Sequence, residues 1–170
     1  MLNVRRVMVL VAAALLGAGL FAAPSAAAAP TNPYLFINGY SNLCLDVAYG
    51  SLDDGARVQQ WDCYGGPPER WHLEVVESLP GMTYYRLRND NSGRCLDVPD
   101  NTPGTGVHQW GCWGGWMQQW QVTHVAPNSL QLRNRQSGLC LDNRDWSLPP
   151  GTTIQQWHCN GAAVQLWRLA

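Results

Sequence analysis

The side chains best suited to chemistry in this sequence of 170 residues are six cysteines and nine tryptophans, and all of the cysteines and six of the tryptophans recur at fixed spacings. Three of the cysteines each have one tryptophan two residues before them and another eight residues after them. Such cysteines can form disulfides or bind zinc, but they are widely separated and the four histidines do not follow the repeat, which disfavours zinc. The three blocks are Trp61, Cys63 and Trp71; Trp110, Cys112 and Trp120; and Trp157, Cys159 and Trp167.

The other three cysteines each begin the triplet Cys-Leu-Asp. Because this layout also occurs three times, one pairing places an identical bridge in every repeat. Each bridge closes a loop of about twenty residues, which stabilises the fold by roughly 3 kcal/mol. An even number of cysteines in an exported chain is typical of disulfides. The predicted disulfides are Cys44–Cys63, Cys95–Cys112 and Cys140–Cys159.

Each Cys-Leu-Asp triplet is preceded by a pair of apolar residues two positions apart, and in the second and third units polar residues separate the pair, which is typical of strands with one buried face. Gly, Pro, Asn and Asp turns separate these stretches, and no segment has a sustained helical period. We therefore predict three units of about four short strands each, over residues 34–76, 84–125 and 129–170. A unit of this size cannot bury its apolar face alone, so the three are expected to close around one core as an all-β β-trefoil.

The nine tryptophans divide into three groups with different predicted roles. The last tryptophan of each block begins a Trp-x-Leu or Trp-x-Val pair and is predicted to lie in the core. The first tryptophan of each block shares a strand face with the following cysteine, where it either packs or contacts a ligand. The third group lies outside the repeat and forms either a contact surface or a loop folded over its own aromatic rings. Its members are Trp113, Trp116 and Trp146.

The amino-terminal segment has the pattern of a secretory signal peptide. Arg5 and Arg6 precede an apolar run that ends in a small-residue region near Ala28. We predict a signal peptide over residues 1–28, a short leader over 29–33, and a secreted, extracellular protein. The apolar run is short for a bilayer span, so no membrane insertion is expected. The remainder is weakly acidic without a basic stripe, which disfavours nucleic acid as a partner.

Motifs for catalysis are missing from the sequence. It contains no nucleophile elbow, no glycine-rich phosphate loop and no His-Glu-x-x-His. Asp53 and Asp54 are adjacent carboxylates, but they lie in a polar stretch that is typical of a turn. A glycosidase needs two carboxylates at a set separation in a cleft. We therefore expect a protein that is not an enzyme and needs no cofactor or metal.

The threefold combination of Cys-Leu-Asp, Gln-x-Trp-x-Cys and Gln-x-Trp resembles the ricin B-type lectin domain and the family-13 carbohydrate-binding modules. The resemblance covers essentially all of the predicted mature chain, and it implies one shallow sugar site in each unit. In that family the Asp accepts hydrogen bonds from sugar hydroxyls and the aromatic residue before the second cysteine stacks on the sugar's apolar face. An Asn and the Gln of the final Gln-x-Trp complete the polar contacts.

Carried over residue by residue, the resemblance predicts sites of unequal completeness. The third unit keeps the most and is the best candidate. All three units lack the Asn, which is replaced by Pro68, Met117 and Val164. In addition, Glu69 replaces the final Gln of unit one and His108 replaces the first Gln of unit two. The predicted carbohydrate-binding residues are Asp46, Gln59 and Trp61 in unit one; Asp97, Trp110 and Gln118 in unit two; and Asp142, Gln155, Trp157 and Gln165 in unit three.

Two functions follow from these expectations. The first is a secreted lectin that binds galactose- or xylose-type glycans. The second is an interaction or targeting subunit of a secreted toxin or hydrolase complex whose sugar sites have decayed, so that its partner is another secreted protein. The missing Asn residues favour the second function, and the fold alone does not decide between the two.

Overall fold

The computed structural model describes residues 32–170, so the predicted signal peptide and most of the leader lie outside the described residues. The described chain forms twelve strands and five short 3-10 turns, with no α-helix among these residues. The strands are β1 Tyr34–Asn38, β2 Cys44–Val47, β3 Val58–Trp61, β4 Arg70–Leu79, β5 Met82–Asn89, β6 Cys95–Asp97, β7 His108–Trp110, β8 Trp120–Ala126, β9 Ser129–Asn134, β10 Cys140–Asn143, β11 Ile154–Trp157 and β12 Trp167–Leu169. The turns are η1 Ala48–Gly50, η2 Pro67–Glu69, η3 Trp116–Gln118, η4 Arg144–Trp146 and η5 Ala163–Gln165.

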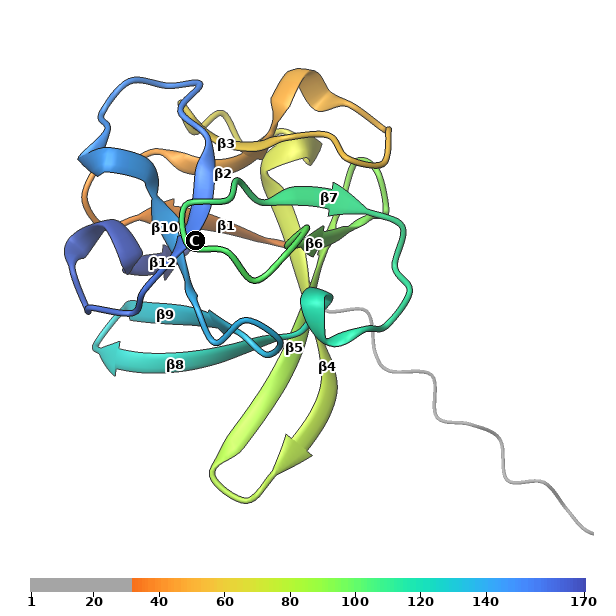
Figure 1. Ribbon diagram of the computed structural model, residues 1–170. Helices are drawn as coiled ribbons and strands as arrows, with labels where there is room; N and C mark the ends of the chain where they lie inside the picture. Colours follow the sequence, from red (N-terminus) through yellow and green to blue (C-terminus); the bar gives the residue numbers. More distant parts are fainter. Residues whose placement is uncertain (1–31) are drawn as a thin grey trace, which may run out of the picture.

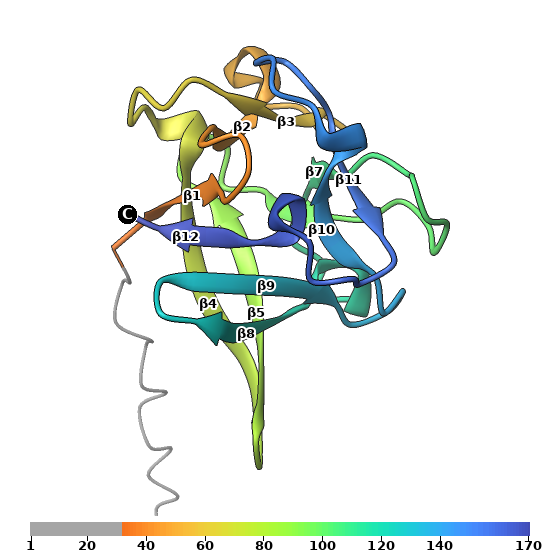
Figure 2. The same cartoon turned by 90° about the vertical axis from the view of Figure 1, so that its left-hand side faces the viewer.

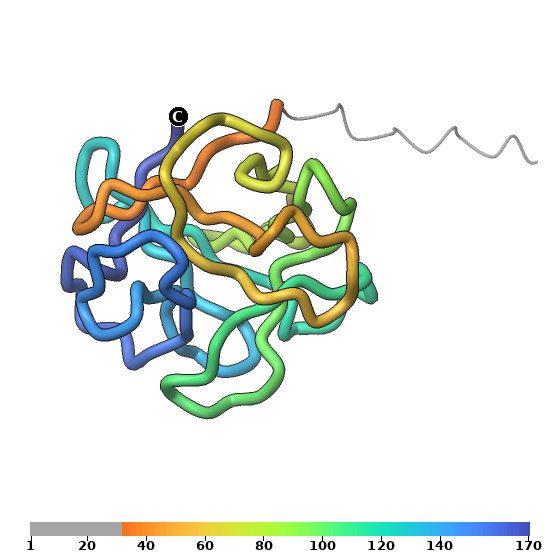
Figure 3. The backbone as a smooth tube through the Cα atoms, turned by 90° about the horizontal axis from the view of Figure 1, so that it is seen from above, coloured from red at the N-terminus to blue at the C-terminus, as the bar shows by residue number. Residues whose placement is uncertain are grey.

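Six of the strands form a closed barrel. Antiparallel pairing runs from β1 to β4, β5, β8, β9 and β12, and β12 returns to β1 through the pair Phe36 and Leu169. The remaining strands form three hairpins, β2–β3, β6–β7 and β10–β11, one in each unit. Viewed from above, the three units lie around one centre (Figure 3). This arrangement is the predicted β-trefoil of three four-stranded units (Figure 1).

Two hairpin turns in the barrel follow from local sequence. Pro80 and Gly81 join β4 to β5, and Asn128 closes the turn from β8 to β9. Gly81 and Asn128 have φ values of 76° and 59°, and Gly and Asn are the residues that tolerate this region best. The β4–β5 hairpin extends well beyond the barrel (Figure 2). Its ladder continues through residues 77–83, between the first two predicted units.

The three tryptophans that were predicted to lie in the core do so. Trp71, Trp120 and Trp167 have at most 1% of their surface exposed. Each indole nitrogen donates a hydrogen bond to the backbone carbonyl of the leucine in its own Cys-Leu-Asp triplet, at 2.9–3.2 Å. A buried indole therefore ties each barrel strand to the hairpin of the same unit.

The predicted disulfide pairing is confirmed. Bridges join Cys44 to Cys63, Cys95 to Cys112 and Cys140 to Cys159, and no free cysteine remains among the described residues. Each bridge links the start of the second strand of a unit to the loop that follows the third strand. Within residues 32–170, no helix has the length and apolar character needed to cross a membrane.

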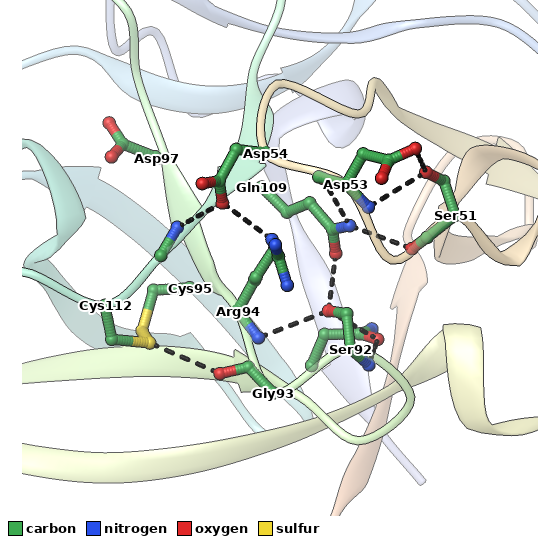
Figure 4. Close-up of polar contacts among 12 residues, drawn as sticks. Ser51, Asp53, Asp54, Ser92, Gly93, Arg94, Cys95, Asp97, Gln109 and Cys112 are labelled. Atoms are coloured by element: carbon green, nitrogen blue, oxygen red, sulfur yellow. Dashed lines mark hydrogen bonds and ion pairs between the residues drawn. A yellow bond between two sulfur atoms is a disulfide. The ribbon is translucent and has the colours of Figure 1, made fainter.

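A buried glutamine in each unit fastens the loop of the preceding unit. Gln109 is fully buried, and its Nε2 donates to the carbonyls of Ser51 and Asp53 at 2.9 and 3.0 Å (Figure 4). Gln156 makes the same contacts with the loop of unit two, and Gln60 with the loop of unit three. These contacts run in one direction around the pseudo-threefold axis, so each hairpin rests on a loop from its neighbour.

Candidate functional site

The Asp of each Cys-Leu-Asp triplet lies at or near the end of the second strand of its unit. Asp46, Asp97 and Asp142 are each only 4% exposed. The antiparallel register places Asp46 opposite Gln59 and Asp142 opposite Gln155, and the Gln Nε2 donates to the Asp Oδ1 at 2.8 Å in both pairs. Sequence reasoning thus selected residues that the structure brings together in units one and three.

In unit two the residue opposite Asp97 is His108. Its Nε2 lies 3.9 Å from Asp97 Oδ1, which is too far for a hydrogen bond. Burial lowers the pKa of His108, and this outweighs the opposite influence of the Asp97 and Asp54 carboxylates. Asp97 Oδ1 therefore lacks the glutamine donor that Asp46 Oδ1 and Asp142 Oδ1 have in the other units.

In units two and three, the glutamine of the final Gln-x-Trp motif donates to the Oδ2 atom of the Asp. In unit three, Gln165 Nε2 donates to Asp142 Oδ2 at 3.0 Å and to the His158 carbonyl at 2.9 Å, while its Oε1 accepts from the Asn160 amide. Gln118 makes equivalent contacts with Asp97 Oδ2, at 2.7 Å, and with the loop of unit two. Both glutamines are fully buried, so their geometry suits positioning of the carboxylate.

The first tryptophan of each block lies at the surface beside the carboxylate. Trp61, Trp110 and Trp157 are 40–44% exposed. Each ring is backed by a glycine from the loop of the preceding unit. A Cβ atom at Gly104 would lie 3.2 Å from the Trp157 ring, and Gly55 and Gly151 stand in the same relation to Trp110 and Trp61. These glycines have φ values of 80–89°, a backbone conformation that favours glycine at all three positions, and at Gly104 the approach to the ring is also tighter than an ordinary contact.

The hollow of unit three combines several polar groups with two indole rings. Its lining includes Asp142 and Gln155, the rings of Trp146 and Trp157, and two residues that sequence reasoning missed, Asp145 and Asn160. Burial raises the pKa of Asp142; hydrogen bonds from Gln155 and Gln165 oppose this, and the Asp145 carboxylate adds to it. The Asp142 carboxylate is therefore a buried acceptor with two amide donors and a face toward the hollow.

The third hollow also contains the residue that replaces the family Asn. Val164 lines it with only 2% of its surface exposed. The backbone carbonyl of Val164 accepts a hydrogen bond from Asn38 Nδ2 at 2.9 Å, which anchors η5 to β1. Asn160 lines the same hollow, and its Oδ1 accepts a hydrogen bond from the Ala162 amide at 2.9 Å.

The hollow of unit one has a different aromatic lining. Asp46, Gln59 and Trp61 share it with Tyr49 and Tyr64. Tyr64 directly follows the second cysteine, as Trp113 and Asn160 do in the other units, so an alignment of the repeats could have identified this position. Tyr49 and Asp145 lie in η1 and η4 at positive φ, which no pattern in the sequence indicates.

The three tryptophans outside the repeat are all more than half exposed and all have a partner. Trp113 Nε1 donates to Asp97 Oδ2 at 3.1 Å, so its indole contacts the carboxylate of unit two. The Arg135 guanidinium lies 4.7 Å from the Trp116 ring, and the Trp146 ring meets Tyr40 edge-on at 5.1 Å. Each of these indoles therefore has a partner within the fold while it stays more than half exposed, and a contact surface at these residues remains a prediction.

Comparisons with known proteins place these features in a wider group. Residues 24–110 and 116–170 match the model of the family described as ricin-type beta-trefoil lectin domain-like. The designed threefold-symmetric protein ThreeFoil is 32% identical, with a TM-score of 0.77 over 81% of this chain and 97% of that one.

Two natural proteins have similar structures. The exo-β-1,3-galactanase 1,3Gal43A from Clostridium thermocellum is 33% identical, with a TM-score of 0.77 over 82% of this chain and 30% of that enzyme. The C-half of the earthworm R-type lectin, solved in complex with GalNAc, has a TM-score of 0.60 over 82% of this chain and 98% of its own, at 14% identity. At this low identity, the structural likeness shows a shared fold and no more.

Proposed function

Because the chain belongs to the ricin-type beta-trefoil lectin domain-like family, we propose that it is a secreted, non-catalytic protein that binds galactose- or xylose-type glycans. Family membership and the lectin neighbours support a carbohydrate-binding role at the coarse level. The three disulfides fit an extracellular location. The galactose-type assignment draws on the galactanase and the GalNAc-bound lectin among the similar structures.

The observation that carries this proposal is the geometry of unit three. Asp142 is held by two amide donors at 2.8 and 3.0 Å, and the Trp157 ring stands beside it in the same hollow. A sugar presents hydroxyls on its edge and C–H groups on its face, so an oriented carboxylate beside an indole matches both. We therefore assign the principal site to unit three, with Asp142 as the acceptor and Trp157 as the stacking surface.

Isothermal titration with galactose, xylose and their oligosaccharides tests this assignment. Asp142→Asn keeps the size of the side chain but removes the charged acceptor, whose hydrogen bonds are worth about 1.5–3 kcal/mol, so affinity should fall by roughly ten- to a hundredfold. Trp157→Ala should also lower the affinity, because it removes the stacking surface. The matched control is Asp97→Asn in unit two, where Trp113 already contacts the carboxylate. If Asp142→Asn and Trp157→Ala bind as the wild type does, unit three is not the principal site.

A targeting subunit is the second candidate, favoured by the galactanase comparison. In that enzyme the matched part is 30% of a longer chain. A β-trefoil that occurs beside other sequence can serve to hold a partner protein, a role that does not need intact sugar sites. Affinity capture from culture medium with the wild type and with Asp142→Asn distinguishes the two functions. A partner that both proteins retain, together with no measurable sugar binding by either, favours the targeting subunit.

A further inference from the structure

Unit one differs from the other two at a buried position behind the carboxylate. Glu69 stands where Gln118 and Gln165 stand in units two and three, and it is fully buried. Its Oε2 accepts hydrogen bonds from the Tyr64 and Gly65 amides at 3.0 and 2.8 Å. Glutamine Oε1 accepts the equivalent amides in the other units, so the two side chains have the same orientation.

The other oxygen of Glu69 occupies the place of a donor. Glu69 Oε1 is buried and has no hydrogen-bond partner. In units two and three, the atom at this position is the glutamine Nε2, which donates to the Asp Oδ2 and to the carbonyl of the residue before the second cysteine. By this correspondence Glu69 Oε1 faces two acceptors, the Asp46 carboxylate and the Asp62 carbonyl. An ionised Glu69 presents an acceptor to acceptors, whereas a protonated Glu69 presents an O–H donor as glutamine does.

We propose that Glu69 carries a proton on Oε1, donates it to Asp46, and thereby makes sugar binding by unit one dependent on pH. Glu69 acts as a positioning residue through Asp46, and this inference rests on the proposed carbohydrate-binding function. With the proton in place, one negative charge is shared and Asp46 keeps its orientation toward the hollow. When the proton leaves, two buried carboxylates repel each other and Asp46 loses the donor that orients it.

The charges around the pair favour retention of the proton. Burial raises the pKa of Glu69; the Gly65 and Tyr64 amides oppose this, and the Asp46 and Asp62 carboxylates add to it. Burial also raises the pKa of Asp46, against a hydrogen bond from Gln59. The pair therefore takes up its first proton above the ordinary range of a glutamate, and that proton belongs to the pair.

The cations of neighbouring elements are engaged elsewhere. The strands and turns packed against η2 are β2, η1 and β5, and β4 follows η2 in the chain. β2 contributes Asp46, and η1 contributes the exposed Tyr49. Arg57 donates to Gln59 Oε1, on the far side of the amide that holds Asp46. The arginines of β4 and β5 form salt bridges with other carboxylates: Arg70 with Asp90, and Arg86 and Arg88 with Glu74.

The test follows unit one alone, in a background where Asp97→Asn and Asp142→Asn silence the other sites. Affinity for galactose and xylose should fall about tenfold as the pH rises through the titration of the pair, the loss expected for one charge-assisted hydrogen bond. Glu69→Gln in the same background should bind equally well across that range. The reciprocal variant Gln165→Glu, in an otherwise wild-type chain, should give unit three the same pH dependence.

Carbon-13 NMR of the Glu69 carboxyl group gives a readout that needs no sugar. The expected result is titration above the ordinary glutamate range, which Asp46→Asn moves. Titration of Glu69 in the ordinary range overturns the proposal, and so does the same pH profile of binding with and without Glu69→Gln in the background that carries Asp97→Asn and Asp142→Asn. If no variant binds sugar at any pH, the proposed function and the pH dependence of binding both fail, while the NMR titration still reports separately whether the proton is shared.

Discussion

The glutamine that fastens each loop to the next unit should make unequal contributions to stability in the three units. Gln109 makes three side-chain hydrogen bonds, because its Oε1 also accepts from Ser92 Oγ at 2.7 Å (Figure 4). Gln60 makes two, because its buried Oε1 has no partner. Otherwise the two residues occupy equivalent, fully buried positions. Gln109→Ala and Gln60→Ala therefore form a matched pair that differs by one hydrogen bond.

The expected magnitudes follow from the hydrogen bonds that each truncation removes. Gln109→Ala removes three hydrogen bonds, and at about 1 kcal/mol for each bond the loss is about 3 kcal/mol. Gln60→Ala removes two, and its two carbonyl partners keep donors from Asn143 Nδ2 and Thr152 Oγ1, so its loss should be about 2 kcal/mol or less. In a domain of this size, a difference of 1 kcal/mol corresponds to roughly 3–4 °C in melting temperature.

Guanidinium unfolding followed by tryptophan fluorescence measures both losses. The slope of the transition should stay the same while its midpoint falls, more for Gln109→Ala than for Gln60→Ala. Gln156→Ala is the control, because Gln156 also makes three contacts, including one from Ser137 Oγ, and should match Gln109→Ala. Equal losses for Gln60→Ala and Gln109→Ala, or losses below about 0.5 kcal/mol for all three variants, would refute the reasoning.

Three further perturbations test other parts of the structure. Trp120→Ala removes a fully buried indole and should lower the free energy of unfolding by about 3–5 kcal/mol; an unchanged melting temperature would contradict its place in the core. Gly104→Ala introduces a side chain at a φ of 89° against the Trp157 ring, so it should cost about 1–2 kcal/mol of stability and weaken sugar binding by unit three, as titration calorimetry can show. The raised pKa of Glu69 means that the folded state keeps a proton that the unfolded chain has lost, so the free energy of unfolding should fall as the pH rises from the ordinary glutamate range to that raised value. Glu69→Gln should make this slope smaller in pH-dependent denaturation, while the raised pKa values of Asp46 and Asp142 still contribute to it.

The repeat explains why so much of the fold could be predicted from the sequence. A feature that occurs three times at one spacing must occupy three equivalent places, which identified both the bridges and the buried Trp71, Trp120 and Trp167. The strand register then placed Asp46 beside Gln59 and Asp142 beside Gln155. These contacts lie within one unit, where the spacing of residues along the chain indicates which residues lie close together in the fold.

Contacts between units were not predictable in the same way. The support of Trp157 by Gly104, and the hydrogen bonds of Gln156 to the loop of unit two, depend on how closed units meet. Residues that do not follow the sequence repeat were not identified as site residues, for a different reason. Trp113 reaches the Asp97 carboxylate from a loop of unit two, and Asp145 lies in the third hollow at a positive φ that Tyr49 shares in unit one; the spacing of the repeats indicates neither loop conformation.

The contact between the loop of one unit and the tryptophan ring of the next affects how the repeats can change during evolution. A repeat that is duplicated or exchanged carries its own acidic acceptor, but it brings the glycine that supports its neighbour's indole. Under the carbohydrate-binding role proposed above, a substitution at Gly55 should alter the stacking surface of unit two, and one at Gly104 that of unit three. A site moved into another scaffold would then also need the loop of the preceding repeat.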